Sequence, residues 1–193
     1  MSQDANNTVV GLARHVAPVE DKLNADNITN VSMIRGDMAD HKGLSEAALA
    51  TAKITEGAVD YLIVNGAYSN QDTKGLTPTE FHGREDLLEE DMTASLHVNV
   101  MGVIFSVNAF LPLIRKGNVK KIVVISTGLA DQALVSESSN PVFVTYSAMK
   151  AALNIVVAKY AVELKTQGIT VLALSPGLVN TQETPRKYSF HRF

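Results

Sequence analysis

Five short runs of apolar residues, separated by longer segments with helical periodicity, constrain the fold of this chain more than any other feature. Most of the runs lack a clean alternation of apolar and polar residues, so the strands are predicted to be buried on both faces. Strands that alternate with helices form a parallel sheet with helices packed against it. The sequence therefore predicts an α/β fold with a doubly wound parallel sheet. The predicted strands are residues 8–13, 30–35, 61–64, 121–125 and 169–174.

Three helical segments are expected, at residues 44–55, 87–115 and 145–166. Within the second segment, four apolar residues recur at helical spacing and are predicted to face the core: Leu96, Val100, Val103 and Val107. Pro112 predicts a bend or an end in that helix, because proline removes a backbone donor and its ring crowds the preceding turn.

Composition limits the classes of function. The chain has 193 residues, of which 46% are hydrophobic and 19% charged, so a single domain can bury a core. A net charge of −3 favours no nucleic-acid partner, and the absence of cysteine excludes disulfides and thiolate chemistry. The five histidines are widely spaced, so no metal site is expected. No signal peptide and no apolar run of membrane-spanning length is evident, which predicts a cytoplasmic protein without a membrane partner.

The spacing of Tyr146 and Lys150 is the most informative local pattern. Residues four positions apart share one face of a helix, so the phenol and the ammonium can converge on one point. A nearby cation favours the phenolate, which lowers the pKa of a tyrosine toward neutrality. Such a pair can donate or accept a proton in carbonyl reduction or alcohol oxidation.

Around this pair, the chain resembles the short-chain dehydrogenase/reductase family. A hydroxyl-bearing strand end, an asparagine in the preceding helix, a degraded Asn-Asn-Ala-Gly turn and a Pro-Gly turn followed by Val-x-Thr occur in the family's order. The resemblance extends over residues 8–181 and implies a Rossmann-like sheet and an NAD(P)(H)-dependent oxidoreductase that interconverts a carbonyl and a secondary alcohol. The motifs are residues 125–128, 99–102, 64–67 and 174–181, together with 146–150.

The resemblance assigns roles residue by residue. Tyr146 is the general acid or base, and Lys150 lowers its pKa and binds the nicotinamide ribose. Ser126 or Thr127 holds the substrate carbonyl; alignment places Thr127 at the family's usual serine, and the choice stays open. Asn99 anchors a water molecule, mainly through its backbone. The long helices imply a homo-oligomer, and the substrate is a small carbonyl or alcohol whose identity is open.

Cofactor preference is suggested by the end of the first predicted strand. An arginine near this position accommodates the 2′-phosphate of NADP, whereas NAD sites carry an acidic residue. Arg14 stands here and the next acidic residue after the strand is Glu20, which favours NADP(H) over NAD(H). Asp37 and Met38 match the family's adenine contact. The remaining cofactor residues implied are Asn65, Gly66, Tyr146, Lys150, Pro176, Gly177, Val179 and Thr181.

One family element is missing from the sequence. The twelve glycines are at least seven positions apart, so no Gly-rich phosphate turn exists, and residues 8–13 match the family's second strand. Residues 1–193 are therefore expected to form a single incomplete domain, truncated at both ends and lacking the C-terminal edge, with an irregular tail at 181–193. Because the first strand of this fold lies between the second and the fourth, its loss leaves two half-sheets with facing edges.

Three outcomes are open for those edges: they close together, another segment fills the gap, or the fold is compromised. In the family, the helix that follows the Gly-rich turn holds the pyrophosphate of the cofactor through backbone N–H groups at its N-terminus. The sequence thus leaves two functions open, an active oxidoreductase or an inactive relic that acts as a binding or regulatory protein.

Overall fold

The computed structural model describes residue 4 and residues 6–177 of the chain. All five predicted strands form where they are expected, each within two residues of its predicted ends. The helices α1 and α5 were not predicted, and neither has a fully buried residue. The elements are β1 Val9–Ala13, α1 Ala17–Ala25, β2 Val31–Arg35, α2 His41–Ile54, β3 Tyr61–Val64, η1 Pro78–Phe81, α3 Glu85–Leu96, η2 His97–Met101, α4 Gly102–Ile114, β4 Lys121–Ile125, η3 Gly128–Ala130, α5 Gln132–Ser138, α6 Val144–Leu164, η4 Lys165–Gln167 and β5 Thr170–Leu174.

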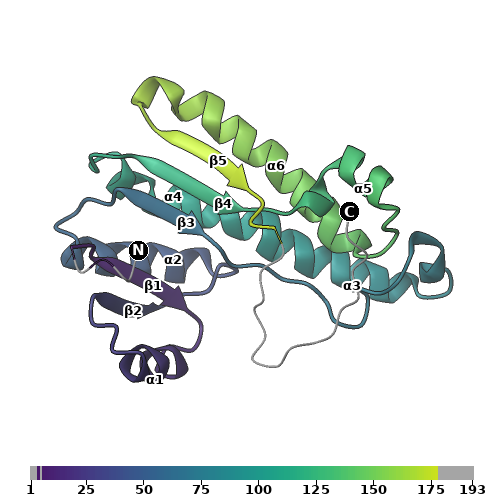
Figure 1. Cartoon of the computed structure of the whole chain (residues 1–193), viewed down its shortest axis with the longest axis horizontal. Coiled ribbons are helices and arrows are strands. Elements are labelled where there is room, and N and C mark those ends of the chain that lie inside the picture. The colour runs from purple at the N-terminus through teal and green to yellow at the C-terminus, as the bar shows by residue number, and fades with distance from the viewer. Residues whose placement is uncertain (1–3, 5, 178–193) are drawn as a thin grey trace.

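The strands form two separate parallel sheets (Figure 1). One sheet pairs β1 with β2, and the other has the order β3-β4-β5. Among the described residues, β1 does not pair with β3 and no other strand lies between them. Of the outcomes left open by the sequence, the edges of β1 and β3 do not close together and no described segment fills the gap, so both edges stay unpaired.

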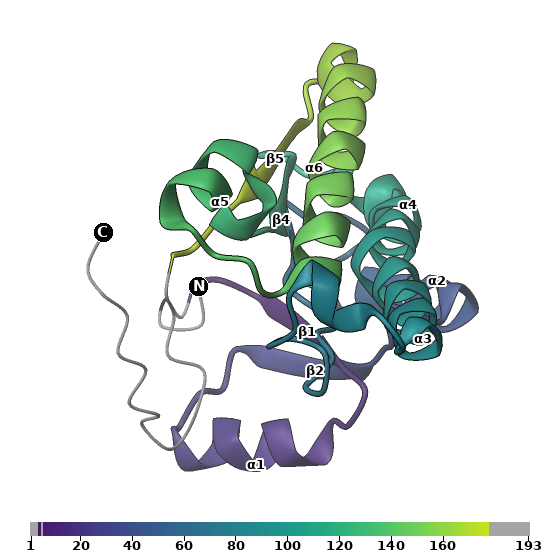
Figure 2. The same ribbon diagram turned by 90° about the vertical axis from the view of Figure 1, so that its right-hand side faces the viewer.

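The three-stranded sheet packs on helices through one face. Ile122, Val124 and Val171 are buried there in a cluster with residues of α4 and α6, and Figure 2 shows these two helices and α2 on the same side of the strands. The opposite face is open, since Ile63 is 47% exposed and Leu174 46%. The expectation that the strands are buried on both faces is wrong for this sheet, because α4 and α6 supply cover on only one side.

The two-stranded sheet is joined to the rest of the molecule through α2. Ala47 and Ala48 of α2 pack against Phe110 and Leu113 of α4, and Leu12 and Ile34 from the two strands contact this cluster. Small side chains on α2 allow this helix to approach α4 closely. Side-chain packing therefore holds the two sheets together where backbone hydrogen bonds do not.

The long predicted helix contains a π turn. It consists of α3, the π turn η2 and α4 in succession, and the N–H of Gly102 donates to the carbonyl oxygen of His97. Val100, Val103 and Val107 are buried as predicted, but Leu96 is 44% exposed. The wider π turn shifts the helical phase, which places Leu96 off the face shared by the other three. Pro112 does not end α4, which continues to Ile114.

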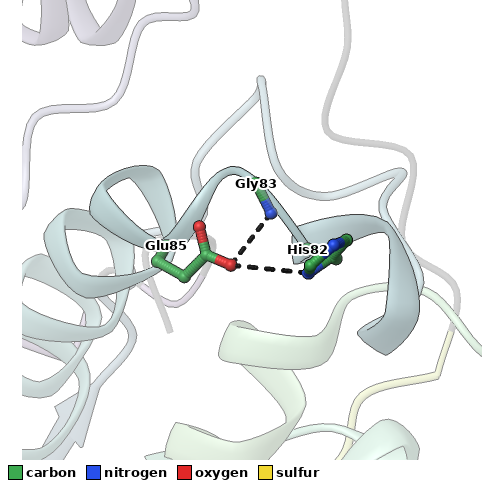
Figure 3. A network of polar contacts seen from close by, with 3 residues as sticks. All are labelled: His82, Gly83 and Glu85. Carbon is green, nitrogen blue, oxygen red and sulfur yellow. Dashed lines mark hydrogen bonds and ion pairs between the residues drawn. The ribbon is translucent and has the colours of Figure 1, made fainter.

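The combined helix of residues 85–114 is long and apolar enough to cross a bilayer by length and composition. Just over half of its most apolar window, 56%, is buried inside the protein, as expected for a core helix. Its first turn begins in a small exposed network (Figure 3): the Glu85 carboxylate accepts the N–H of Gly83 at 2.9 Å and lies 3.8 Å from the His82 ring. The hydrogen bond from Gly83 lowers the pKa of Glu85.

Candidate active site

Lys150 lies at the centre of the candidate site. The residue projects from α6, is only 1% exposed, and its Nζ donates to the carbonyl oxygen of Ile125 at 2.8 Å. This bond ties the helix to the carboxyl end of β4. Burial disfavours the ammonium form and lowers the pKa of Lys150 to about 8. A lysine held in this way can be charged or neutral close to physiological pH.

Tyr146 lies one helical turn before Lys150, with the Lys150 Nζ 5.8 Å from the centre of its ring. The ring also meets the edge of Phe143 at 6.5 Å. Within residues 6–177 its hydroxyl has no hydrogen-bond partner. Burial raises the pKa of Tyr146, which differs from the lowering expected from its spacing with Lys150. The Lys150 amine lies over the ring and donates to Ile125, and burial of the phenol is the cause of the rise.

The two candidate hydroxyls after β4 have different partners. Ser126 is buried and its Oγ donates to Oδ1 of Asn154 at 2.7 Å. Thr127 Oγ1 accepts the N–H of Leu129 at 3.2 Å and so begins the short helix η3. Ser126 thus faces α6, and Thr127 has a capping role in the turn.

Asn154 is a residue that sequence reasoning missed. It stands four positions after Lys150 and eight after Tyr146, so the three side chains share one face of α6. Its carboxamide bonds the Ser126 hydroxyl, which orients that hydroxyl relative to Lys150. The spacing along the helix, read together with the serine at the strand end, is the signal that could have identified it.

Asn99 connects the π turn to the loop after β3. Its side chain is fully buried and bonds the backbone of Tyr68 twice, accepting the N–H at 2.8 Å and donating to the carbonyl oxygen at 2.8 Å. The carboxamide therefore fixes a loop, whereas the backbone of Asn99 lies in a turn with altered hydrogen bonding. Local π turns of this kind are frequent at functional sites.

The predicted cofactor residues lie at the carboxyl ends of the strands. Asn65 and Gly66 follow β3, Pro176 and Gly177 follow β5, and all four are exposed. Arg14 follows β1 and is also exposed.

The segment after β2, which contains Asp37 and Met38, packs against the turn at Gly66. A Cβ at Gly66 would meet Sδ of Met38, so a larger residue at this turn would require the Met38 side chain to move. The Asp37 carboxylate accepts the N–H of Ala39 at 2.9 Å. Val179 and Thr181 lie outside the described residues.

The altered pKa of Lys150 predicts a pH-dependent stability. Between about pH 8 and 10.5 the folded chain carries a neutral Lys150, whereas the unfolded chain still binds a proton there. Unfolding then takes up a proton, so the free energy of unfolding rises with pH across this window, by about 3 kcal/mol in total. Urea denaturation at successive pH values is expected to show this rise for the natural chain and not for Lys150→Met. If the free energy of unfolding changes with pH equally in the two proteins, Lys150 is not the group whose pKa is lowered by folding.

Comparisons with known proteins agree on one family. The family described as short chain dehydrogenase matches residues 1–190. A short-chain dehydrogenase/reductase of Arthrinium sp., atnB, is 39% identical over 184 residues, which are 95% of this chain and 69% of the relative. Another, AacuF of Aspergillus aculeatus, is 42% identical over 190 residues and covers 95% and 69%. The chain thus spans about two thirds of the length of these relatives.

Solved structures show the same fold. The NADPH-bound carbonyl reductase from chicken fatty liver superposes with a TM-score of 0.70 at 21% identity, covering 88% of this chain and 68% of that protein. The Pseudomonas aeruginosa RhlG/NADP complex gives a TM-score of 0.68 at 20% identity, covering 88% and 62%. Taken with the sequence match over almost its full length, this places the chain in the short-chain dehydrogenase/reductase family, a family of oxidoreductases with a Rossmann fold.

Proposed function

We propose that the protein is an NADP(H)-dependent oxidoreductase that interconverts a small carbonyl compound and a secondary alcohol. The observation that carries the proposal is the buried Lys150 amine, fixed at the end of β4, with the Tyr146 phenol one turn away on the same helix. Few side chains other than this pair could move a proton here, since the neighbouring Ser126 and Asn154 bond each other.

Tyr146 transfers the proton in this proposal. Its hydroxyl has no competing hydrogen bond within the described part of the chain, so it is free to donate to a carbonyl oxygen during reduction or to accept from an alcohol during oxidation. Toward the described residues Lys150 donates one of its three N–H bonds, to Ile125, and the other two would serve a ribose hydroxyl or the phenolate. A positive Lys150 would stabilise the phenolate that forms after proton transfer.

Ser126 and Thr127 place a hydroxyl near the reacting oxygen. Ser126 donates to Asn154, so its lone pairs remain available as acceptors, and a rotation of its O–H would let it donate to substrate. The backbone of Asn99, in the π turn, anchors a water molecule that relays the proton onward. Each of these roles is implied by family membership and is consistent with the contacts described.

The described residues fit the nicotinamide and adenosine ends of the cofactor but not the pyrophosphate between them. The exposed turns at Asn65–Gly66 and Pro176–Gly177 flank the end of β4, and would hold the nicotinamide and its ribose together with Lys150. Arg14, Asp37 and Met38 would contact the adenosine half. The described residues contain no glycine-rich helix start for the pyrophosphate. When bound, the nicotinamide ring would supply or accept the hydride.

Arg14 is proposed to set the preference for NADP(H). It is exposed at the end of β1 and has no ion-pair partner within the described residues, which leaves the guanidinium available to a phosphate. Arg14→Ala is expected to weaken NADPH binding about tenfold and to leave NADH binding within about twofold, because only NADPH carries the 2′-phosphate. Fluorescence titration with each cofactor measures this difference. Equal losses for both cofactors would remove Arg14 from the phosphate site.

The function itself is tested with the pure 193-residue chain. NADPH fluorescence should change on binding, and NADPH should be oxidised in the presence of a panel of small ketones and aldehydes. An absence of cofactor binding at saturating NADPH would overturn the proposal for this chain.

A further inference from the structure

A fully buried carboxylate stands where the loop after β3, helix α3 and the start of α6 meet. Asp91 of α3 is 0% exposed. Its Oδ2 accepts from the Thr145 hydroxyl at 2.6 Å and from the Thr73 hydroxyl, and its Oδ1 accepts from Ser95 at 3.2 Å. All three hydroxyl residues are buried as well. We call these four residues the Asp91 cluster.

The cluster joins segments that are far apart in the sequence. Thr73 lies in the loop that follows β3, and Thr145 immediately precedes Tyr146 at the start of α6. A backbone bond supports the same junction, since the N–H of Phe143 donates to the carbonyl oxygen of Lys74 at 3.0 Å. Ser95 differs from the other two, because it belongs to α3 and adds no link to another element.

The charge of Asp91 is met by hydroxyl donors and not by a cation. No ion pair involves Asp91 in the described residues. Hydrogen bonds from hydroxyls to a carboxylate are short and strong, and a buried polar group that loses its partner costs free energy. Losing the donor on Thr145 or Thr73 removes a strong hydrogen bond and, unlike the loss of Ser95, also detaches a segment from α3.

We propose that Asp91 is a positioning residue for Tyr146. Through Thr145 it fixes the first turn of α6, and through Thr73 it holds the loop that packs against that turn. The residue does not touch the reacting atoms. This inference rests on the proposed function for its catalytic consequence, whereas the placement of Tyr146 can be measured without any turnover.

The sharpest test removes one link and keeps the shape of the side chain. Thr145→Val deletes the hydroxyl that reaches Asp91, and Thr145→Ser restores it. Ser95→Ala is the matched control, because it also removes a buried hydroxyl from Asp91 but leaves both other segments attached. Thr73→Val repeats the test from the loop side, in case Thr145→Val fails to fold.

Two measurements on the full chain need no cofactor. Amide exchange at Phe143 and Ser147 reports the first turn of α6, where the Ser147 N–H donates to the Phe143 carbonyl oxygen. The fluorine resonance of 3-fluorotyrosine at position 146, assigned with Tyr146→Phe, reports the surroundings of the phenol. With Thr145→Val we expect exchange about tenfold faster and a shifted resonance. The variants Thr145→Ser and Ser95→Ala are expected to keep the exchange rates and the fluorine resonance of the natural chain.

Measurements of turnover show how the placement of Tyr146 affects catalysis. Thr145→Val should lower kcat about tenfold or more with KM little changed, because the phenol is misplaced and the binding surfaces are not. If Thr145→Val and Ser95→Ala give the same exchange rates and the same resonance, the positioning role is overturned. If the natural chain has no turnover but exchange responds as expected, the proposed function fails and the positioning of Tyr146 by Asp91 still holds.

Discussion

Replacing Tyr146 by phenylalanine is expected to lower the rate of carbonyl reduction by about 10²–10⁴-fold and to leave the fold intact. The substitution removes only the hydroxyl, and general acid catalysis by one positioned group contributes about this factor. No described residue loses a hydrogen bond, and the packing of the ring against Phe143 is kept. The measurement is NADPH oxidation under saturating substrate, with thermal unfolding of both proteins to compare stability.

Tyr160→Phe is the matched control for this experiment. Tyr160 lies on the same helix, but its hydroxyl donates to Asn108 Oδ1 of α4 at 2.8 Å. The control should lose about 1 kcal/mol of stability through this bond and keep its turnover. A Tyr146→Phe protein with more than about a tenth of the natural rate would show that another group moves the proton.

Supplying a strand between β1 and β3 is expected to have the largest effect on stability. The experiment fuses to the chain the strand–turn–helix unit that opens the family's fold, taken from the Arthrinium relative. A strand of this length forms on the order of five to ten backbone hydrogen bonds with the two edges, each worth about 0.5–1.5 kcal/mol, so the free energy of unfolding should rise by several kcal/mol. The unit also brings a helix start at which backbone N–H groups hold a pyrophosphate.

The same fusion tests whether the divided sheet limits the activity. NADPH should bind at least about tenfold more tightly to the fused protein, since an anion at a helix N-terminus gains several hydrogen bonds. A proline in the middle of the added strand is the control, because proline removes a donor and is excluded from central strands. If the unfused chain already binds and turns over NADPH equally well, the added phosphate turn is unnecessary for this protein.

Much of the fold could be predicted because its signals are local. The strand at Lys121–Ile125 consists of β-branched residues after its first position, and such a run has one plausible structure. The absence of the first strand also followed from the sequence, through the missing glycine-rich turn and the strand order of the fold, but what becomes of the two facing edges did not. The helix α1 was missed because it is short and its nine residues bury no side chain.

Other features depend on contacts that no local pattern records. The π turn at His97–Met101 displaces Leu96 from the core, although its spacing with Val100 is helical. The Asp91 cluster brings together residues 18 and 54 positions apart from Asp91. Tyr146 and Lys150 were identified by their spacing, but the raised pKa of the phenol follows from burial, which spacing cannot reveal.

The junction between α2 and α4 has a consequence for cooperativity. Sheets usually unfold as one unit because backbone bonds run across every strand, whereas here only side chains such as Ala48 and Phe110 connect one half to the other. Amides of β1 and β2 therefore have a route to exchange by detachment of their half alone, with β3, β4 and β5 still intact. The segment that carries β1 and β2 is therefore expected to be a separable folding unit, attached to the rest of the molecule by side-chain packing and not by strand pairing.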